Sequence, residues 1–157
     1  MVTRIFLHGL ESSNQGTKSN FFRRLYPDML LPNFTGSLEE RMKKLDGILS
    51  GKSGIRLVGS SFGGLMASIY AAENEPDVDC LVLLAPALNL LGFSKHILKR
   101  VTIPVHIYHG TNDQVIPIKP VKRVAGKAFS NLNFHTVDDD HFLHKTFKTI
   151  DWKELLN

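Results

Sequence analysis

Short apolar runs alternate with amphipathic segments along the chain, about five times. Such runs predict strands, at residues 5–7, 29–31 (the weakest), 55–58, 81–84, 105–108 and 134–137. Segments with helical periodicity lie between or after them, at residues 18–25, 37–49, 64–73, 117–127 and 142–156. The uninterrupted run at 81–84 is typical of a strand buried on both faces. This alternation predicts an α/β fold with one doubly wound, mainly parallel sheet of about six strands and helices on both faces.

The second helix has the clearest start signal. Ser37-x-x-Glu40 matches a capping box, in which each side chain bonds the other residue's backbone N–H. The apolar residues that follow share one helical face, at Leu38, Met42, Leu45 and Leu49. We therefore expect a helix that begins at Ser37 and packs this face on the sheet.

Composition narrows the class of protein. A chain of 157 residues with 43% hydrophobic and 22% charged residues predicts one globular domain spanning residues 1–157. No apolar run approaches the roughly 20 residues of a transmembrane helix, and the N-terminus lacks a signal-peptide pattern. Cys80 is the single cysteine and cannot form an internal disulfide. We expect a cytoplasmic protein without a membrane partner.

The net charge of +4 comes from residues 95–157, which hold ten basic and six acidic residues. These basic residues are spaced by three or four, as on the solvated faces of helices. A nucleic-acid interface would instead concentrate them in a stripe with groove-reading or aromatic partners. The sequence therefore predicts no nucleic-acid partner and leaves the oligomeric state open.

The strongest chemical signal directly follows the strand at 55–58. Gly59-Ser60-Ser61-Phe62-Gly63 fits G-x-S-x-G with Ser61 at its centre, and a helix follows. Glycines at these positions permit the tight strand-to-helix turn that exposes a nucleophilic serine above a sheet. A motif centred on Ser60 would lack the flanking glycines. Ser61 is therefore the candidate nucleophile.

Two later strands also end in residues that can carry acid–base chemistry. Asp113 follows the strand at 105–108 within His109-Gly110-Thr111-Asn112-Asp113, and His141 follows the strand at 134–137. Because ligands bind parallel sheets at the carboxyl ends of the strands, these residues and Ser61 are expected at one edge. The chain order is serine, acid, histidine, that is nucleophile, acid and base, as in a catalytic triad of this kind.

The chain resembles the α/β-hydrolase superfamily in four segments that occur in the expected order. The segments are F-L-H-G-L at residues 6–10, G-S-S-F-G at 59–63, G-T-N-D-Q-V-I-P at 110–117 and D-H-F at 140–142. Within the superfamily, H-G-L-E-S-S at residues 8–13 is similar to the compact bacterial YqiA-like esterases. Members are usually longer and often carry a helical cap. Between Ala85 and Val101 this chain has room for only one or two helical turns, so we expect a minimal core without a cap domain.

The resemblance implies roles for individual residues. Ser61 would attack an acyl carbonyl, His141 would transfer its proton, and Asp113 would orient the imidazole. The backbone N–H groups of Leu10 and Phe62 would bind the oxyanion. His8 is expected to shape the oxyanion loop through hydrogen bonds rather than to react.

Asp138, Asp139 and Asp140 compete with Asp113 for the role of acid. They adjoin His141 in sequence, but a neighbour in a short loop tends to point away from the ring. A carboxylate from the neighbouring strand end can approach Nδ1 in the ring plane. We therefore predict Asp113 as the acid and the Asp138–Asp140 run as a turn former that accepts backbone N–H bonds.

Several apolar residues could line an acyl pocket or belong to the core. They are Leu88, Leu91, Phe93, Val115, Ile116 and Phe142. Lys18 and Glu11 flank the first loop and are expected to form a surface pair, with a substrate contact as the alternative. The Asp138–His141 run with His144 lacks a partner motif such as H-E-x-x-H, so no metal and no cofactor are expected.

The sequence therefore predicts a serine carboxylesterase that acts on small-molecule esters, most readily those with small acyl groups. A thioesterase or amidase would use the same triad. A non-catalytic ligand-binding or interaction protein of the same fold is the alternative from another class.

Overall fold

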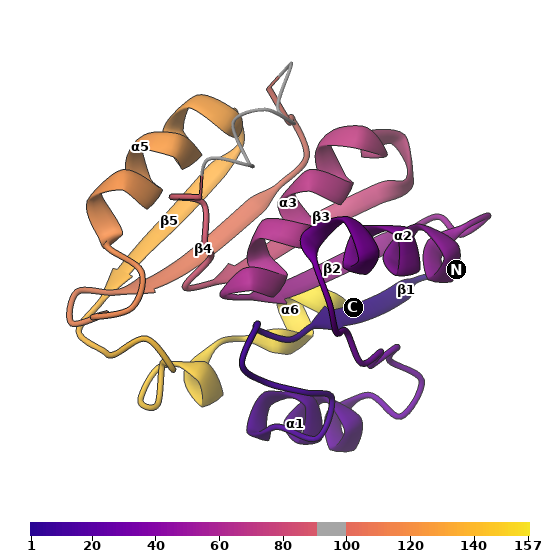
Figure 1. Cartoon of the computed structure of the whole chain (residues 1–157), viewed down its shortest axis with the longest axis horizontal. Helices are drawn as coiled ribbons and strands as arrows, with labels where there is room; N and C mark the ends of the chain where they lie inside the picture. Colours follow the sequence, from indigo (N-terminus) through magenta and orange to yellow (C-terminus); the bar gives the residue numbers. More distant parts are fainter. Residues whose placement is uncertain (91–99) are drawn as a thin grey trace.

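The computed structural model describes residues 1–90 and 100–157. Within these residues, five parallel strands form one sheet in the order β1-β2-β3-β4-β5 (Figure 1). The strands are β1 (Thr3–Leu7), β2 (Ile55–Ser60), β3 (Val78–Leu84), β4 (Val105–Gly110) and β5 (Leu132–Val137). The α-helices are α1 (Thr17–Leu25), α2 (Leu38–Leu49), α3 (Phe62–Glu73), α5 (Ile118–Ala128) and α6 (Trp152–Leu156). The predicted α/β fold class is confirmed.

The sheet separates two apolar cores because strand side chains alternate between its faces. On β1, Ile5 and Leu7 join the core beneath α2, α3 and α5, whereas Phe6 joins the core beneath α1 and α6. On β3, Leu81 and Leu83 face the first core and Val82 the second. Figure 1 shows α3 and α5 on one side of the sheet and α1 on the other.

The sixth expected strand, at residues 29–31, is reduced to one bridging residue. Leu30 lies on the free side of β1: its N–H donates to Arg4 and its carbonyl accepts from Phe6, at 2.9 and 3.1 Å. Pro27 and Pro32 flank this run and limit it, because proline donates no ladder hydrogen bond. Among the described residues, the sheet thus has five strands, and a single bridge at Leu30 takes the place of the expected sixth.

The bridge at Leu30 makes the sheet doubly wound. The chain leaves β1 through α1 to Leu30 on one side and returns through α2 to β2 on the other. The winding therefore reverses at β1, and ligands of such sheets bind outside the strand ends at this point. The loop after β1 and the turn after β2 meet there.

The expectation of a largely helical segment at 142–156 is wrong. The segment contains a 3₁₀ turn at Phe147–Thr149 and the short helix α6. Ile150 between them has an extended backbone, with φ −65° and ψ 136°. Phe147 and Trp152 nevertheless pack in the second core. The apolar residues of this segment therefore indicate that it is buried, not that it forms one continuous helix. No helix among the described residues is long and apolar enough to cross a bilayer.

Candidate active site

Ser61 occupies a strained turn between β2 and α3. Its backbone has φ 55° and ψ −115°, a conformation that costs a non-glycine residue free energy. A Cβ on Gly59 would collide with the carbonyl of Gly63, and one on Gly63 would collide with the carbonyl of Leu7. Only glycines let the strand and helix approach this closely, and the close approach holds Ser61 above the sheet.

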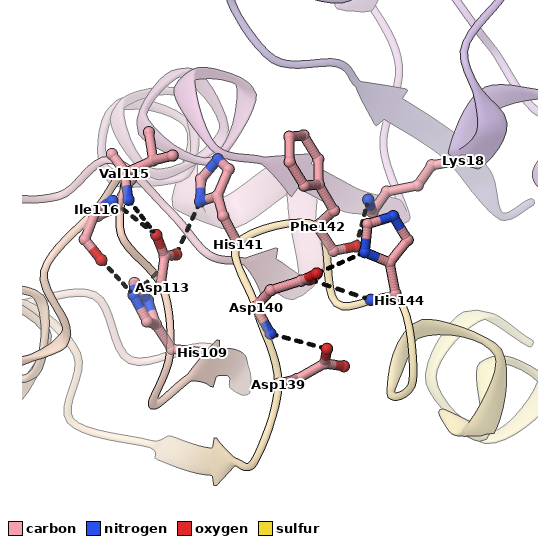
Figure 2. A network of polar contacts seen from close by, with 10 residues as sticks. All are labelled: Lys18, His109, Asp113, Val115, Ile116, Asp139, Asp140, His141, Phe142 and His144. Carbon is pink, nitrogen blue, oxygen red and sulfur yellow. Dashed lines mark hydrogen bonds and ion pairs between the residues drawn. The ribbon is translucent and has the colours of Figure 1, made fainter.

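Asp113 and His141 come together from the loops after β4 and β5. Nδ1 of His141 lies 2.7 Å from Oδ2 of Asp113 (Figure 2). A carboxylate can only accept, so Nδ1 carries the proton and Nε2 has a free lone pair. This tautomer suits a general base.

The Asp113 carboxylate is fully buried and held from several sides. Its Oδ1 accepts hydrogen bonds from the backbone N–H groups of Val115 and Ile116, at 2.9 and 2.7 Å. His109 lies on the other side, with Nε2 at 3.3 Å from Oδ2 and 2.9 Å from the carbonyl oxygen of Ile116. These contacts leave the carboxylate little freedom to turn away from His141.

The Asp138–Asp140 run has the predicted role of turn former. Buried Asp139 accepts hydrogen bonds from the backbone N–H groups of Lys145 and Thr146, at 3.0 and 2.8 Å. Burial opposes ionisation of Asp139, but hydrogen bonds from Asp140, Thr146 and Lys145 outweigh it and lower its pKa. None of the three aspartates bonds His141 through its side chain.

Ser61 and His141 line the same cavity, whose volume is about 700 Å³. The loop after β1 and the start of α1 form much of its wall. Within the described residues, the Ser61 hydroxyl makes no hydrogen bond to protein. It is therefore available for a ligand, and nucleophile–base contacts are often loose before substrate binds.

Sequence comparison matches no family model and no curated protein, but solved structures share the fold. Est1E of Butyrivibrio proteoclasticus with ferulic acid bound has a TM-score of 0.76 at 16% identity, over 95% of this chain and 85% of that one. An alpha-beta serine hydrolase homologue from Coxiella burnetii also has 0.76, at 20% identity over 99% and 83%. The monoacylglycerol lipase of Paleococcus ferrophilus has 0.71, at 17% identity over 96% and 89%.

The chain has the α/β-hydrolase fold. Its similarity to the smaller group of YqiA-like esterases stays a prediction.

In this α/β-hydrolase fold, two residues with unpaired backbone amides line the cavity together with Ser61. Leu10 and Phe62 both line the cavity, and neither backbone N–H has an acceptor among the described residues. Phe62 is the first residue of α3, where amides lack helical partners and favour negative charge. Both amides suit an oxyanion hole.

His8 holds the loop after β1 through hydrogen bonds, as expected. Its Nε2 accepts from the backbone N–H of Phe34 at 2.9 Å, so its Nδ1 carries the proton and donates to the Gly9 carbonyl at 2.7 Å. Burial lowers the pKa of His8, and the charges of Arg41 and Lys44 add to this effect. A neutral His8 therefore ties the loop to the segment before α2.

Some of the predicted pocket residues line the cavity, and one belongs to the core. Val115 and Phe142 line the cavity and are 61% and 58% exposed. Leu88 corrects the expectation: it is buried in the core beneath α3 and does not line the cavity. Leu91 lies outside the described residues. Leu90, which the sequence did not single out, lines the cavity and is 40% exposed.

Lys18 and Glu11 both line the cavity, which agrees with the alternative that they contact a ligand rather than form a surface pair. The sequence places Lys18 beside the first loop, but only the fold brings it to the loop after β5. No group of three or more His, Cys, Asp or Glu side chains within residues 1–90 and 100–157 could hold a metal ion.

Proposed function

We propose that this protein is a serine hydrolase of carboxylic esters, with Ser61 as nucleophile, His141 as base and Asp113 as the orienting acid. One observation carries the proposal. His141 donates to a fully buried Asp113 while it lines the same cavity as the strained Ser61. A merely structural histidine would not need a free Nε2 at the cavity wall.

The proposed reaction uses this chain's own groups. Ser61 Oγ attacks the ester carbonyl carbon while His141 Nε2 takes the hydroxyl proton. The oxygen that becomes negative accepts hydrogen bonds from the N–H groups of Leu10 and Phe62. The C–O bond to the leaving group then breaks, and His141 returns the proton to the departing alcohol.

Water completes the cycle. His141 takes a proton from water, which attacks the acyl–Ser61 ester, and Ser61 regains its proton when the acid leaves. Asp113 stabilises the imidazolium that forms twice in the cycle. Two of the similar structures are named for an esterase and a lipase, which supports an ester as the substrate.

Labelling with a fluorophosphonate probe followed by peptide mapping tests the proposal. We expect one labelled serine, Ser61, and no label in Ser61→Ala. Ser60→Ala is the matched control, because Ser60 is adjacent and lines the same cavity; it should keep the label. Label on Ser60, or none in folded protein, would contradict the proposal.

A further inference from the structure

The first turn of α1 forms one wall of the cavity that holds Ser61. Gly16, Thr17, Lys18 and Ser19 all line it. This wall contributes nothing to the triad or the oxyanion hole described above. Its polar groups are therefore available for a part of the ligand away from the reacting carbonyl.

Lys18 brings a positive charge to this wall. Its half-buried side chain runs along the Phe147 ring, with Nζ 5.4 Å from the ring centroid. Nζ donates to the carbonyl oxygen of Phe142 at 2.9 Å (Figure 2). An ammonium has three N–H donors, and Lys18 has no ion pair within the described part of the chain. Two donors are left for a ligand.

Ser19 adds a hydroxyl to this wall. The residue is 1% exposed and lines the cavity, and its Oγ makes no hydrogen bond among the described residues. The hydroxyl can therefore donate to a ligand group that accepts a hydrogen bond.

The backbone of the same turn also favours negative charge. The N–H groups of Thr17, Lys18 and Ser19 find no acceptor among residues 1–90 and 100–157. Gly16, the N-cap, has no side chain to cap them, and the first turn has no acidic residue. Free amides at a helix start attract anions.

Neighbouring carboxylates do not neutralise this wall. Burial lowers the pKa of Lys18, while the charges of Asp140 and Asp139 oppose that effect, but neither lies within ion-pair distance of Lys18. Asp140 bonds the His144 ring and Asp139 bonds backbone amides. Glu11 also lines the cavity but is exposed to solvent, which screens its charge.

We infer that Lys18, Ser19 and the first amides of α1 form a subsite for an anionic group, and that the preferred ligand is an ester carrying a carboxylate. The inference rests on the proposed function for the ester, whereas the preference for an anion rests on this wall alone. Lys18 is then a specificity-determining residue.

Ligands that cannot be hydrolysed test the subsite separately from catalysis. Two matched pairs of ketones differ in one group: 4-benzoylbutyrate with valerophenone, in which a methyl replaces the carboxylate, and 3-butanoylbenzoate with butyrophenone, in which a hydrogen replaces it. The first pair carries the charge on the acyl side of the ester mimic and the second on the leaving-group side. Calorimetry gives the dissociation constant of each ketone with the wild-type protein and its variants.

At least one carboxylate should bind tenfold or more tightly than its neutral partner, a difference of about 1.4 kcal/mol. Lys18→Met should reduce that preference to within twofold, Lys18→Arg should retain part of it, and Ser19→Ala should weaken it a few-fold. Lys145→Met is the control, because Lys145 is an exposed lysine that does not line the cavity; it should change nothing.

Three outcomes would overturn the subsite: no carboxylate preferred, a preference that survives Lys18→Met, or an equal loss for charged and neutral ketones. An equal loss for both kinds of ketone would show that Lys18 only stabilises the structure, through its hydrogen bond to the loop after β5. A different result would separate the two proposals. If binding prefers the carboxylate through Lys18 but the probe does not label Ser61, the subsite is supported and the proposed esterase activity is contradicted.

Discussion

His109 and His141 approach the same oxygen of one carboxylate, Oδ2 of Asp113, at 3.3 and 2.7 Å (Figure 2). The two rings differ in environment. His109 is fully buried, and its Nδ1 has no hydrogen-bond partner among the described residues. Burial lowers the pKa of His109; the Ile116 carbonyl and Asp113 oppose this, and His141 adds to it. His109 is therefore neutral. It lies against the Asp113 carboxylate without cancelling the negative charge that His141 needs.

Replacing the orienting acid should abolish most of the activity. In Asp113→Asn, the amide can no longer hold the His141 tautomer or stabilise the imidazolium. We expect kcat for p-nitrophenyl butyrate to fall by about 10⁴, as for the corresponding serine-protease change. Steady-state kinetics and a circular dichroism spectrum of the variant would measure the loss and check the fold.

Two other aspartates serve as controls for this change. Asp138 is exposed and, among the described residues, accepts only from the Asn112 side chain, so Asp138→Asn should leave kcat unchanged. Asp139→Asn should reduce kcat less than tenfold but lower the free energy of unfolding by about 1–3 kcal/mol, because Asp139 satisfies buried amides. An essential Asp138 or Asp139 beside a dispensable Asp113 would show that the acid is misassigned.

Two helical glycines should respond oppositely to alanine. A Cβ on Gly63 collides with the Leu7 carbonyl, so Gly63→Ala should destabilise the fold by more than about 3 kcal/mol, beyond the usual range for single changes. Gly47 in α2 has open space around it, and Gly47→Ala should stabilise by about 0.5–1 kcal/mol. Urea unfolding measures both. A tolerated Gly63→Ala would argue against the tight turn at Ser61.

Stability should fall as the solution becomes mildly acidic. Burial lowers the pKa values of His8 and His109, whereas both titrate near 6.5 when unfolded. Below about pH 6.5, the unfolded chain binds protons that the folded chain rejects, so each histidine costs up to about 1.4 kcal/mol per pH unit. Above that pH, their contribution to stability is fully present.

Urea unfolding at pH 7.5 and pH 5.5 measures this dependence. His8→Gln keeps an acceptor for Phe34 and removes one titrating group, so it should flatten the pH dependence. Equal stability of the wild-type protein at both pH values would refute the buried neutral histidines.

Acyl selectivity should level off at short chains. The cavity holds about 700 Å³, and four large apolar side chains at it stay exposed: Leu10, Leu90, Val115 and Phe142. The methylene groups of a long acyl chain that extend beyond the cavity stay in water. They therefore gain little of the roughly 0.8 kcal/mol of binding free energy that a fully buried CH₂ contributes. We expect kcat/KM for p-nitrophenyl butyrate to equal or exceed that for the palmitate ester. A steep rise toward palmitate would reveal a further apolar channel.

Local patterns predicted features that depend on neighbours in sequence. The capping box at Ser37 is present, with Glu40 N–H donating to Ser37 Oγ at 3.2 Å. The strained turn at Ser61 follows equally from its own glycines. Ser37 and Glu40 are three positions apart, and Gly59 and Gly63 are four apart, so a local pattern indicates both features; the approach of Gly63 to the distant Leu7 carbonyl follows only from the fold.

Tertiary structure decided the rest. Leu88 and Leu90 are alike in sequence, yet one packs in the core and the other lines the cavity. Lys18 and Phe142 are 124 residues apart and meet through a hydrogen bond. The sequence by itself determined five of the six expected strands, the turn motif at Ser61 and the order of the candidate triad, because periodicity and turn chemistry act locally. Which distant side chains share the cavity depended on sheet order and helix packing, since these alone set the relative positions of segments that no local pattern links.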